Sequence, residues 1–401
     1  MQALGERYLR FQKALDGAPL PAALVDLAAF DRNLARLLAP VVAAGKTLRV
    51  ASKSVRVPAL LRRALAAKGA RGVMTYCAKE TLALAEDGFE DLLLAYPTVQ
   101  RSDQEALVAA SKRTTVSVVC DAVEQLEALS SVAGVAGVEG RVIAEVDLGF
   151  RPVGDTVHLG VRRSPLRTAT DIAAFADRVA RTPHLRFCGV MGYEAHIAGL
   201  GDSFAGKQIV SAARRALKVR AQREVERTRG EIATVLRARG HAIETYNGGG
   251  SGSVDWTSRE PWLTEVTAGS GLLDSHLFDH YQDIRFEPAA YFALQVVRRP
   301  KAGMVTCLGG GFVASGQAGV DRLPIPALPE GCALLPLEGA GEVQTPVVLP
   351  AGVEVALGEP IFFRHAKAGE LAEHFAEYHL IDGARVELAP TYRGRGWCFL
   401  G

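Results

Sequence analysis

The 401-residue sequence lacks the features that mark several classes of protein. Its six cysteines are scattered and form no Cys-x-x-Cys pair, which argues against a zinc ribbon or a disulfide framework. No run approaches the ~20 apolar residues of a membrane-spanning helix, and the charged segment 1–15 lacks the apolar core of a signal peptide. Neither sign of charge dominates, since 46 basic residues face 44 acidic ones. We therefore expect a cytoplasmic protein with no nucleic-acid or membrane partner.

Up to about residue 286, short apolar runs alternate with segments of helical periodicity. Most of these runs are continuously apolar, as strands buried on both faces are. Segment 30–44 has an apolar helical face and carries Asp31 in its first turn, where the helix dipole favours a carboxylate. Eight strand–helix repeats predict an α/β fold, a (β/α)8 TIM barrel over residues 1–286. The predicted strands are 22–25, 48–52, 72–76, 91–95, 115–120, 141–147, 187–193 and 243–247.

Three further regions complete the organisation. After residue 286, short strand-like runs are separated by Gly and Pro, which predicts an all-β domain over residues 287–401. The first twenty residues fit neither pattern and could pack on either domain, the β domain included. Segment 206–239 is rich in Arg, Lys, Glu and Ala at helical spacing. A solvated helix on the outer ring of the barrel is favoured there over a basic binding surface.

Lys53 is the first candidate for chemistry. In a TIM barrel, functional side chains lie at the C-terminal ends of the strands, and Lys53 directly follows the second predicted strand. Desolvation in the barrel mouth would lower the pKa of its amine, as Schiff-base formation requires. An ordinary lysine at the start of a loop is the alternative interpretation.

A glycine-rich loop follows the eighth predicted strand, in the segment NGGGSGS. Backbone N–H groups and hydroxyls of such a loop bind phosphate, and phosphate sites at this end of the barrel are frequent. No lysine follows the glycines, which excludes a nucleotide-binding loop of the GKS/T type. A flexible Gly/Ser turn is the alternative. The candidate phosphate contacts are Gly249, Gly250, Ser251 and Gly252, with Gly269 and Ser270 as a second contact.

Two other strand ends carry polar side chains. Tyr193 and His196 close the seventh predicted strand and could touch a cofactor or substrate ring, or be structural. Arg151 ends the sixth predicted strand, and Arg162 and Arg163 follow it. One of these arginines could pair with a substrate carboxylate or a cofactor oxygen, although surface positions would explain them equally well.

A last candidate pair lies near the end of the chain, where His365 and Lys367 follow a predicted strand of the β domain. Because they are two residues apart, they face the same way on an extended chain. Polar alternation of this kind is also typical of a solvated strand face.

These segments together resemble one known group of enzymes. The chain is similar, over most of its length and in the same order, to the D-threonine aldolase and D-serine dehydratase group, within the pyridoxal-phosphate (PLP) enzymes of fold type III that include alanine racemase. The matching segments are RVASKSVRVP, VDLGFR, GYEAH, NGGGSGS, TEVTAGSGLLD and GEPIFFRHAKAGEL.

The resemblance implies a homodimer whose active site forms at the subunit interface, with PLP as cofactor and Lys53 as its Schiff-base lysine. It also shows departures. Ala51 and Val55 stand where the family has histidines two residues before and after the lysine. Where the family binds a divalent metal through His-x-Cys or His-x-Asp, this chain has His365 and Lys367, so a divalent metal is doubtful here. Lys367 instead places a positive charge where the metal would lie.

The resemblance therefore implies a PLP-dependent lyase that acts on a β-hydroxy-α-amino acid by retro-aldol cleavage, with deamination as a variant. His365 could remove the hydroxyl proton and Lys367 could stabilise the resulting alkoxide, which makes metal-free aldol chemistry the more compatible with this sequence. Two other functions remain open at this point. The protein could be an amino-acid racemase, or a PLP-binding protein without catalytic activity.

Overall fold

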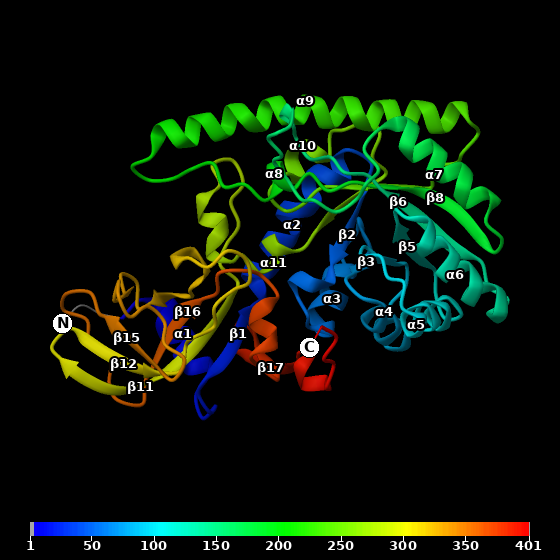
Figure 1. Cartoon of the computed structure of the whole chain (residues 1–401). Helices are drawn as coiled ribbons and strands as arrows, with labels where there is room; N and C mark the ends of the chain where they lie inside the picture. The colour runs from blue at the N-terminus through cyan, green and yellow to red at the C-terminus, as the bar shows by residue number, and fades with distance from the viewer. Residues whose placement is uncertain (1–3, 401) are drawn as a thin grey trace.

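A computed structural model describes residues 4–400 and confirms the (β/α)8 barrel with an appended β domain (Figure 1). Eight parallel strands close the barrel, each hydrogen-bonded to its neighbours. Seven of them lie where the sequence predicted them. In spatial order, the barrel strands are β10 (Glu265–Ala268), β2 (Thr47–Ala51), β3 (Ala70–Thr75), β4 (Leu92–Leu94), β5 (Val116–Cys120), β6 (Gly140–Glu145), β8 (Leu185–Met191) and β9 (Thr245–Gly248).

Helices cover the outside of the barrel (Figure 1). The helix predicted over 30–44 is confirmed but begins earlier, because the Asp26 side chain caps it by accepting a hydrogen bond from the backbone N–H of Ala28. The helices of this part of the chain are α2 (Leu27–Ala43), α3 (Pro58–Leu65), α4 (Ala78–Glu86), α5 (Arg101–Ser111), α6 (Val123–Ala136), α7 (Ala169–Arg181), α8 (Ala195–Ala198), α9 (Gln208–Ala238), α10 (Val254–Thr257) and α11 (Ser270–Leu273). A short strand, β7 (Pro152–Asp155), follows β6.

The predicted first barrel strand is wrong. Strand β1 (Ala22–Asp26) pairs with β11 and β17 of the β domain, and β10 takes its place in the barrel. All five residues of β1 are buried, so its sequence looks like that of a barrel strand. The second sheet is formed by β14 (Ala333–Leu334), β15 (Gln344–Val348), β12 (Met304–Leu308), β11 (Ala290–Lys301), β1, β17 (Glu377–Asp382) and β18 (Arg385–Pro390), with β16 (Pro360–Arg364) and β13 (Ile325–Leu328) on its flank.

The N-terminal helix α1 (Glu6–Ala14) lies on this second sheet (Figure 1). Its buried rings, Tyr8 and Phe11, make edge-to-face contacts with Phe362 of β16, and Phe11 also contacts Tyr291 of β11. The sheet of the β domain is therefore built and covered by both ends of the chain. Among residues 4–400, no helix has the length and apolarity that crossing a bilayer requires.

Candidate active site

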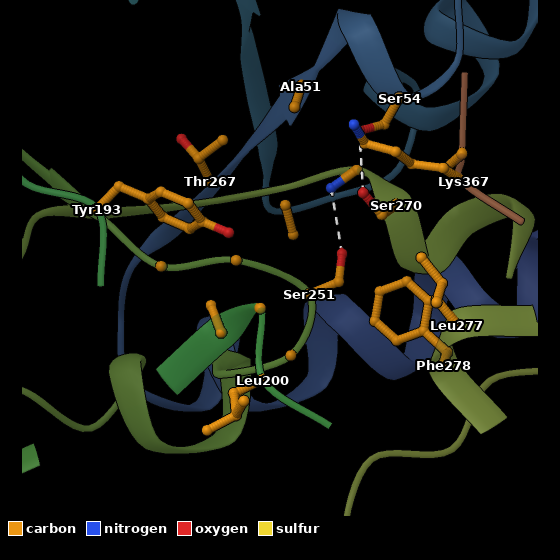
Figure 2. A pocket seen from close by; sticks show the side chains of 18 of the residues that line it. Ala51, Ser54, Tyr193, Leu200, Ser251, Thr267, Ser270, Leu277, Phe278 and Lys367 are labelled. Atoms are coloured by element: carbon orange, nitrogen blue, oxygen red, sulfur yellow. Dashed lines mark hydrogen bonds between the residues drawn. The ribbon is translucent and has the colours of Figure 1, made fainter. Parts of the chain in front are cut away.

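A cavity of about 630 Å³ lies at the C-terminal ends of the barrel strands, between the barrel and the β domain. Figure 2 shows part of its lining. Most candidates from the sequence meet there, although they are far apart along the chain. The candidates that line the cavity are Lys53, Arg163, Tyr193, Gly249, Gly250, Ser251, Gly252, Gly269, Ser270 and Lys367.

Lys53 enters the cavity from the short turn η1 (Ser52–Ser54), directly after β2. Its Nζ donates a hydrogen bond to the hydroxyl of Tyr96 at 2.7 Å and lies 5.4 Å from the centroid of that ring. Tyr96, which follows β4, was not predicted from the sequence. A tyrosine just past an apolar run is a common packing residue, and only the closure of the barrel brings it to the lysine.

Arg163 is the arginine of the predicted three that lines this cavity. Its guanidinium lies over the rings of Tyr96 and Tyr193, at 5.4 and 5.8 Å from their centroids. Arg151 instead binds the carboxylate of Asp147 at 2.5 Å. Arg151 lines a neighbouring cavity of about 520 Å³, together with Arg162 and Arg163.

Tyr193 presents a neutral phenol to the cavity. Burial, together with the neighbouring charge of Glu194, raises the pKa of its hydroxyl to about 12. His196, which the sequence also suggested as a contact of the cofactor or substrate, is not among the described residues that line the cavity. Its ring stacks on Phe150 at 6.3 Å, and burial lowers its pKa to about 4. His196 is therefore a neutral packing residue in this structure.

The glycine-rich loop is joined to the turn after β10, as a phosphate cradle requires. The hydroxyl of Ser251 accepts hydrogen bonds from the backbone N–H groups of Gly269 and Gly271, at 3.3 and 2.9 Å. The hydroxyls of Ser54 and Ser270 lie 3.2 Å apart beside them (Figure 2). Hydroxyls and N–H donors from three segments thus converge on one region of the cavity.

The loop also lies too close to α8 for side chains at its glycines. A Cβ atom on Gly252 would lie 2.0 Å from the carbonyl oxygen of Ala198, and one on Gly250 would lie 2.9 Å from the Cβ of Ala198. The bare backbone therefore faces the cavity, where a phosphate can approach it closely.

A buried ion network supports this loop from behind. The Glu194 carboxylate accepts hydrogen bonds from the Arg229 guanidinium at 2.6 Å, the Gly249 N–H at 3.2 Å, the Ser253 hydroxyl at 2.9 Å and the Thr257 hydroxyl at 2.7 Å. Burial alone would raise the pKa of Glu194, but the charge of Arg229 and these donors hold it below its usual range.

Arg229 lies on α9 and is wholly buried. It also donates to the Gly192 carbonyl at 2.8 Å and pairs with Glu260. The sequence placed this helix in solvent, which is wrong for Arg229. The sequence of α9 contains many arginines, and nothing in it distinguishes the buried Arg229 from the exposed ones.

The floor of the cavity is polar as well. Asn247 of β9 donates to the Thr267 hydroxyl and to the Glu265 carboxylate of β10, both at 2.7 Å. Glu265 in turn accepts from the buried Arg49 of β2 at 2.7 Å, and Arg49 also contacts Asp91 at 3.0 Å. These bonds connect the neighbouring strands β9, β10 and β2. They hold the side chains of Asn247 and Thr267, which line the cavity.

Comparison with known proteins places this arrangement in a family. Residues 25–272 match the family model described as alanine racemase, N-terminal domain. The chain belongs to this family. It is also 26% identical over 283 residues to a D-threonine aldolase from Arthrobacter sp, a match that covers 70% of this chain and 68% of that protein.

Two solved structures of similar fold cover nearly the whole chain. The D-threonine aldolase of Filomicrobium marinum has a TM-score of 0.79 and 23% identity, covering 94% of this chain and 96% of its own. The D-threo-3-hydroxyaspartate dehydratase of Delftia sp. HT23 has a TM-score of 0.73 and 20% identity, covering 93% and 97%. At these identities, the likeness extends to the fold, β domain included.

Lys367 of the β domain forms part of one wall of the cavity. Its Nζ donates to the Ser315 hydroxyl at 2.6 Å and pairs with the Glu370 carboxylate at 3.0 Å. Ser315 also donates to Glu370 from its backbone N–H at 2.7 Å. Two neighbouring segments of the β domain therefore fix one ammonium group at the cavity wall.

His365 does not face the cavity with Lys367, contrary to the prediction. It is buried at the end of β16, and it is absent from the cavity lining in the part of the chain that the structure describes. Burial and the charge of the adjacent Arg364 lower its pKa to about 3. The chain leaves the extended conformation after Arg364, so alternation no longer places the two side chains on one face.

The donor chemistry of this pair does not fit a divalent cation. An ammonium group offers no lone pair to a cation, and the Nζ of Lys367 lies 3.0 Å from the Glu370 carboxylate. Within residues 4–400, no group of three His, Cys, Asp or Glu side chains is arranged to hold a metal ion.

Proposed function

We propose that this protein is a PLP-dependent lyase that cleaves a β-hydroxy-α-amino acid to a glycine-type amino acid and an aldehyde, as its D-threonine aldolase relatives are named to do. The observation that carries the proposal is the meeting of Lys53 with the Gly249–Gly252 loop and Gly269–Ser270 in one cavity. A lysine amine and a bare-backbone anion cradle are the two groups that a phosphorylated aldehyde cofactor needs.

The cavity fits PLP on two observations of the structure. The cradle is kept free of side chains, since a Cβ on Gly250 or Gly252 would collide with α8. Arg163 and Tyr193 face the same space with a guanidinium and a phenol. When bound, PLP supplies an electron sink that stabilises negative charge at the substrate α-carbon. Lys53 would hold the cofactor covalently, and Arg163 would neutralise negative charge on its ring.

Lys367 gives the proposal its reaction type. In a retro-aldol cleavage the Cα–Cβ bond breaks, its electron pair passes to the α-carbon, and the β-hydroxyl gives its proton to water as the carbonyl forms. The α-carbon then takes up one proton from water to give the glycine-type product, so the protons balance. A fixed ammonium at the cavity wall can stabilise the negative charge on that oxygen. The position of His365 outside the cavity removes it as the base for this step.

A racemase is the second candidate function, because the family model that residues 25–272 match is described as the N-terminal domain of alanine racemase. Tyr96 lies 2.7 Å from the Lys53 amine and could exchange a proton with it. Racemisation would yield the antipode with no aldehyde. For either reaction we propose a cytoplasmic homodimer.

The test begins with apo-protein titrated with PLP. The proposal expects an absorption band of the lysine-linked cofactor that disappears in Lys53→Ala. Incubation with D-threonine and with D-serine, each with and without EDTA, then separates the reactions. EDTA-resistant aldehyde release supports the aldolase, whereas antipode without aldehyde supports the racemase. Keto acid and ammonia that EDTA abolishes would contradict the metal-free mechanism.

Lys367→Met tests the oxygen-stabilising role, because methionine keeps the length of the side chain without its charge. We expect kcat for aldehyde release to fall by about a hundredfold to a thousandfold, as when one transition-state donor is removed. The matched control is Lys207→Met, an exposed lysine just before α9, which should leave kcat unchanged. Equal activity of the two variants would contradict the role of Lys367.

A further inference from the structure

The C-terminal segment after β18 leaves the second sheet and packs on the barrel. Figure 1 shows the end of the chain next to α3. Tyr392 is wholly buried, and its ring contacts Trp397 and Phe399 at 5.2 and 5.6 Å. Phe399 also reaches Tyr76, which follows β3, at 6.3 Å. These aromatic contacts fasten the last residues of the chain to the rim of the barrel.

Tyr392 makes two directed bonds across this contact. Its hydroxyl donates to the carboxylate of Glu80 at 2.9 Å, and its backbone N–H donates to the carbonyl of Arg56 at 2.9 Å. Glu80 is buried on α4 and also accepts from the backbone N–H of Tyr76 at 2.7 Å. The buried carboxylate thus ties the C-terminal segment to the barrel, and the second bond reaches the loop that carries Lys53.

That loop is held in an unusual conformation. Arg56 has a φ of +53°, in the left-handed region that non-glycine residues seldom adopt. Its guanidinium donates to the carbonyl of Lys53 at 3.2 Å and pairs with Glu373 of the β domain at 2.5 Å. Gly369 is so close on the other side that a Cβ atom there would lie 1.8 Å from the same Lys53 carbonyl. The backbone of Lys53 is therefore enclosed by groups from the β domain.

We infer that Tyr392 is a positioning residue that holds the loop 52–56, so that the Lys53 amine faces the cofactor aldehyde. The inference rests on the proposed function of Lys53. The glycines of the phosphate cradle lie on other segments, while the Ser54 hydroxyl of this loop lies 3.2 Å from the Ser270 hydroxyl beside them. The Glu80 carboxylate that accepts from the Tyr392 hydroxyl also interacts with the side chain of Ser52, the first residue of the loop. Removing the hydroxyl should therefore loosen the loop and lower the fraction of cofactor linked to Lys53, while the glycines of the cradle still retain the phosphate.

Tyr392→Phe is the test, measured on apo-protein saturated with PLP. The readout is the absorbance of the lysine-linked cofactor divided by the total PLP bound, which alkali releases for counting. We expect the ratio of linked to unlinked cofactor to fall about fivefold to tenfold, the factor that loss of one buried hydrogen bond carries. Tyr8→Phe is the matched control, because it removes a buried hydroxyl that donates to Pro360 on the second sheet. Its ratio should equal that of the wild type.

Phe399→Ala is a second variant that keeps the inference testable if Tyr392→Phe does not fold. Phe399 is partly exposed, and its loss loosens the ring of Tyr392 without touching Glu80. A lowered ratio in either variant, with a normal ratio in Tyr8→Phe, supports the positioning role. A lowered melting temperature with an unchanged ratio overturns it, because Tyr392 would then be structural only. A wild-type protein without any linked cofactor would overturn the proposed function, and this inference with it.

Discussion

The buried arginine behind the phosphate loop gives the sharpest stability prediction. Arg229 and Glu194 both have fully buried side chains, and the Nη2 atom of Arg229 lies 2.6 Å from the Oε2 atom of Glu194. Arg229→Gln would leave the carboxylate of Glu194 buried without its counter-charge. Removal of one partner from such a pair costs about 3–5 kcal/mol, because the remaining charge is neither solvated nor compensated. The free energy of unfolding should fall by that amount.

The same helix offers a matched control. Arg227 pairs with Glu231 one turn further along α9, and their side chains are 61% and 50% exposed. Exposed pairs of this spacing contribute about 0.3–0.5 kcal/mol, so Arg227→Gln should barely change the stability. Urea unfolding of the two apo-variants, followed by circular dichroism, gives both values. A loss below about 1 kcal/mol for Arg229→Gln would refute the electrostatic role of Arg229, since the penalty for an uncompensated buried charge would be missing.

Three further predictions concern the loop, the pH dependence and the assembly. Gly252→Ala should weaken PLP binding at least about tenfold, measured by equilibrium titration, because its Cβ would lie 2.0 Å from the Ala198 carbonyl; Gly5→Ala, where the added Cβ meets no atom within 4 Å, is the control and should bind normally. Burial lowers the pKa of His196 to about 4 from 6.5, so the unfolded chain binds the extra proton and stability falls as the pH drops through this window. Between pH 7 and 5 this group should cost about 2 kcal/mol, and unfolding of His196→Leu should show that much less loss; an identical pH dependence would contradict the neutral state of His196. Static light scattering at micromolar concentration should give the mass of a dimer, and a mass near 42.7 kDa would contradict the proposed homodimer.

The sequence predicted the barrel because most of its strands lie in short, largely continuous apolar runs. The eighth, β10, was missed because Glu265 and Thr267 interrupt its apolar pattern, and both point to the hydrogen-bond network that crosses the barrel. Strand β1 was assigned to the barrel because it is equally apolar. It is buried between β11 and β17, and only pairing with residues far along the chain distinguishes the two positions. A local pattern reports burial, but it does not report which sheet buries the strand.

The residues of the candidate site also fall into those that the local sequence predicts and those that depend on contacts between distant segments. The glycines of the phosphate loop could be predicted, because a run of glycines directly after a strand is itself the sequence signal of a loop that exposes its backbone. Arg163 was left undecided among three arginines, and Tyr96 was missed, because contacts of a guanidinium and an amine with one ring depend on how the strand ends converge. His365 was misplaced for a related reason: alternation holds only while the chain stays extended, and β16 ends at Arg364.

Lys367 bears on which of the two reactions we expect. At the cavity wall the Lys367 ammonium contacts the Ser315 hydroxyl and the Glu370 carboxylate. A fixed monovalent charge stabilises an alkoxide less than a divalent ion does, but cleavage of the Cα–Cβ bond requires only that the oxygen lose a proton and become a carbonyl. Elimination of the hydroxyl would require the C–O bond to break, a step that depends more strongly on a Lewis acid. With Lys367 in the proposed role we expect cleavage to be favoured over dehydration, and the ratio of aldehyde to keto acid is the quantity in which that preference should appear.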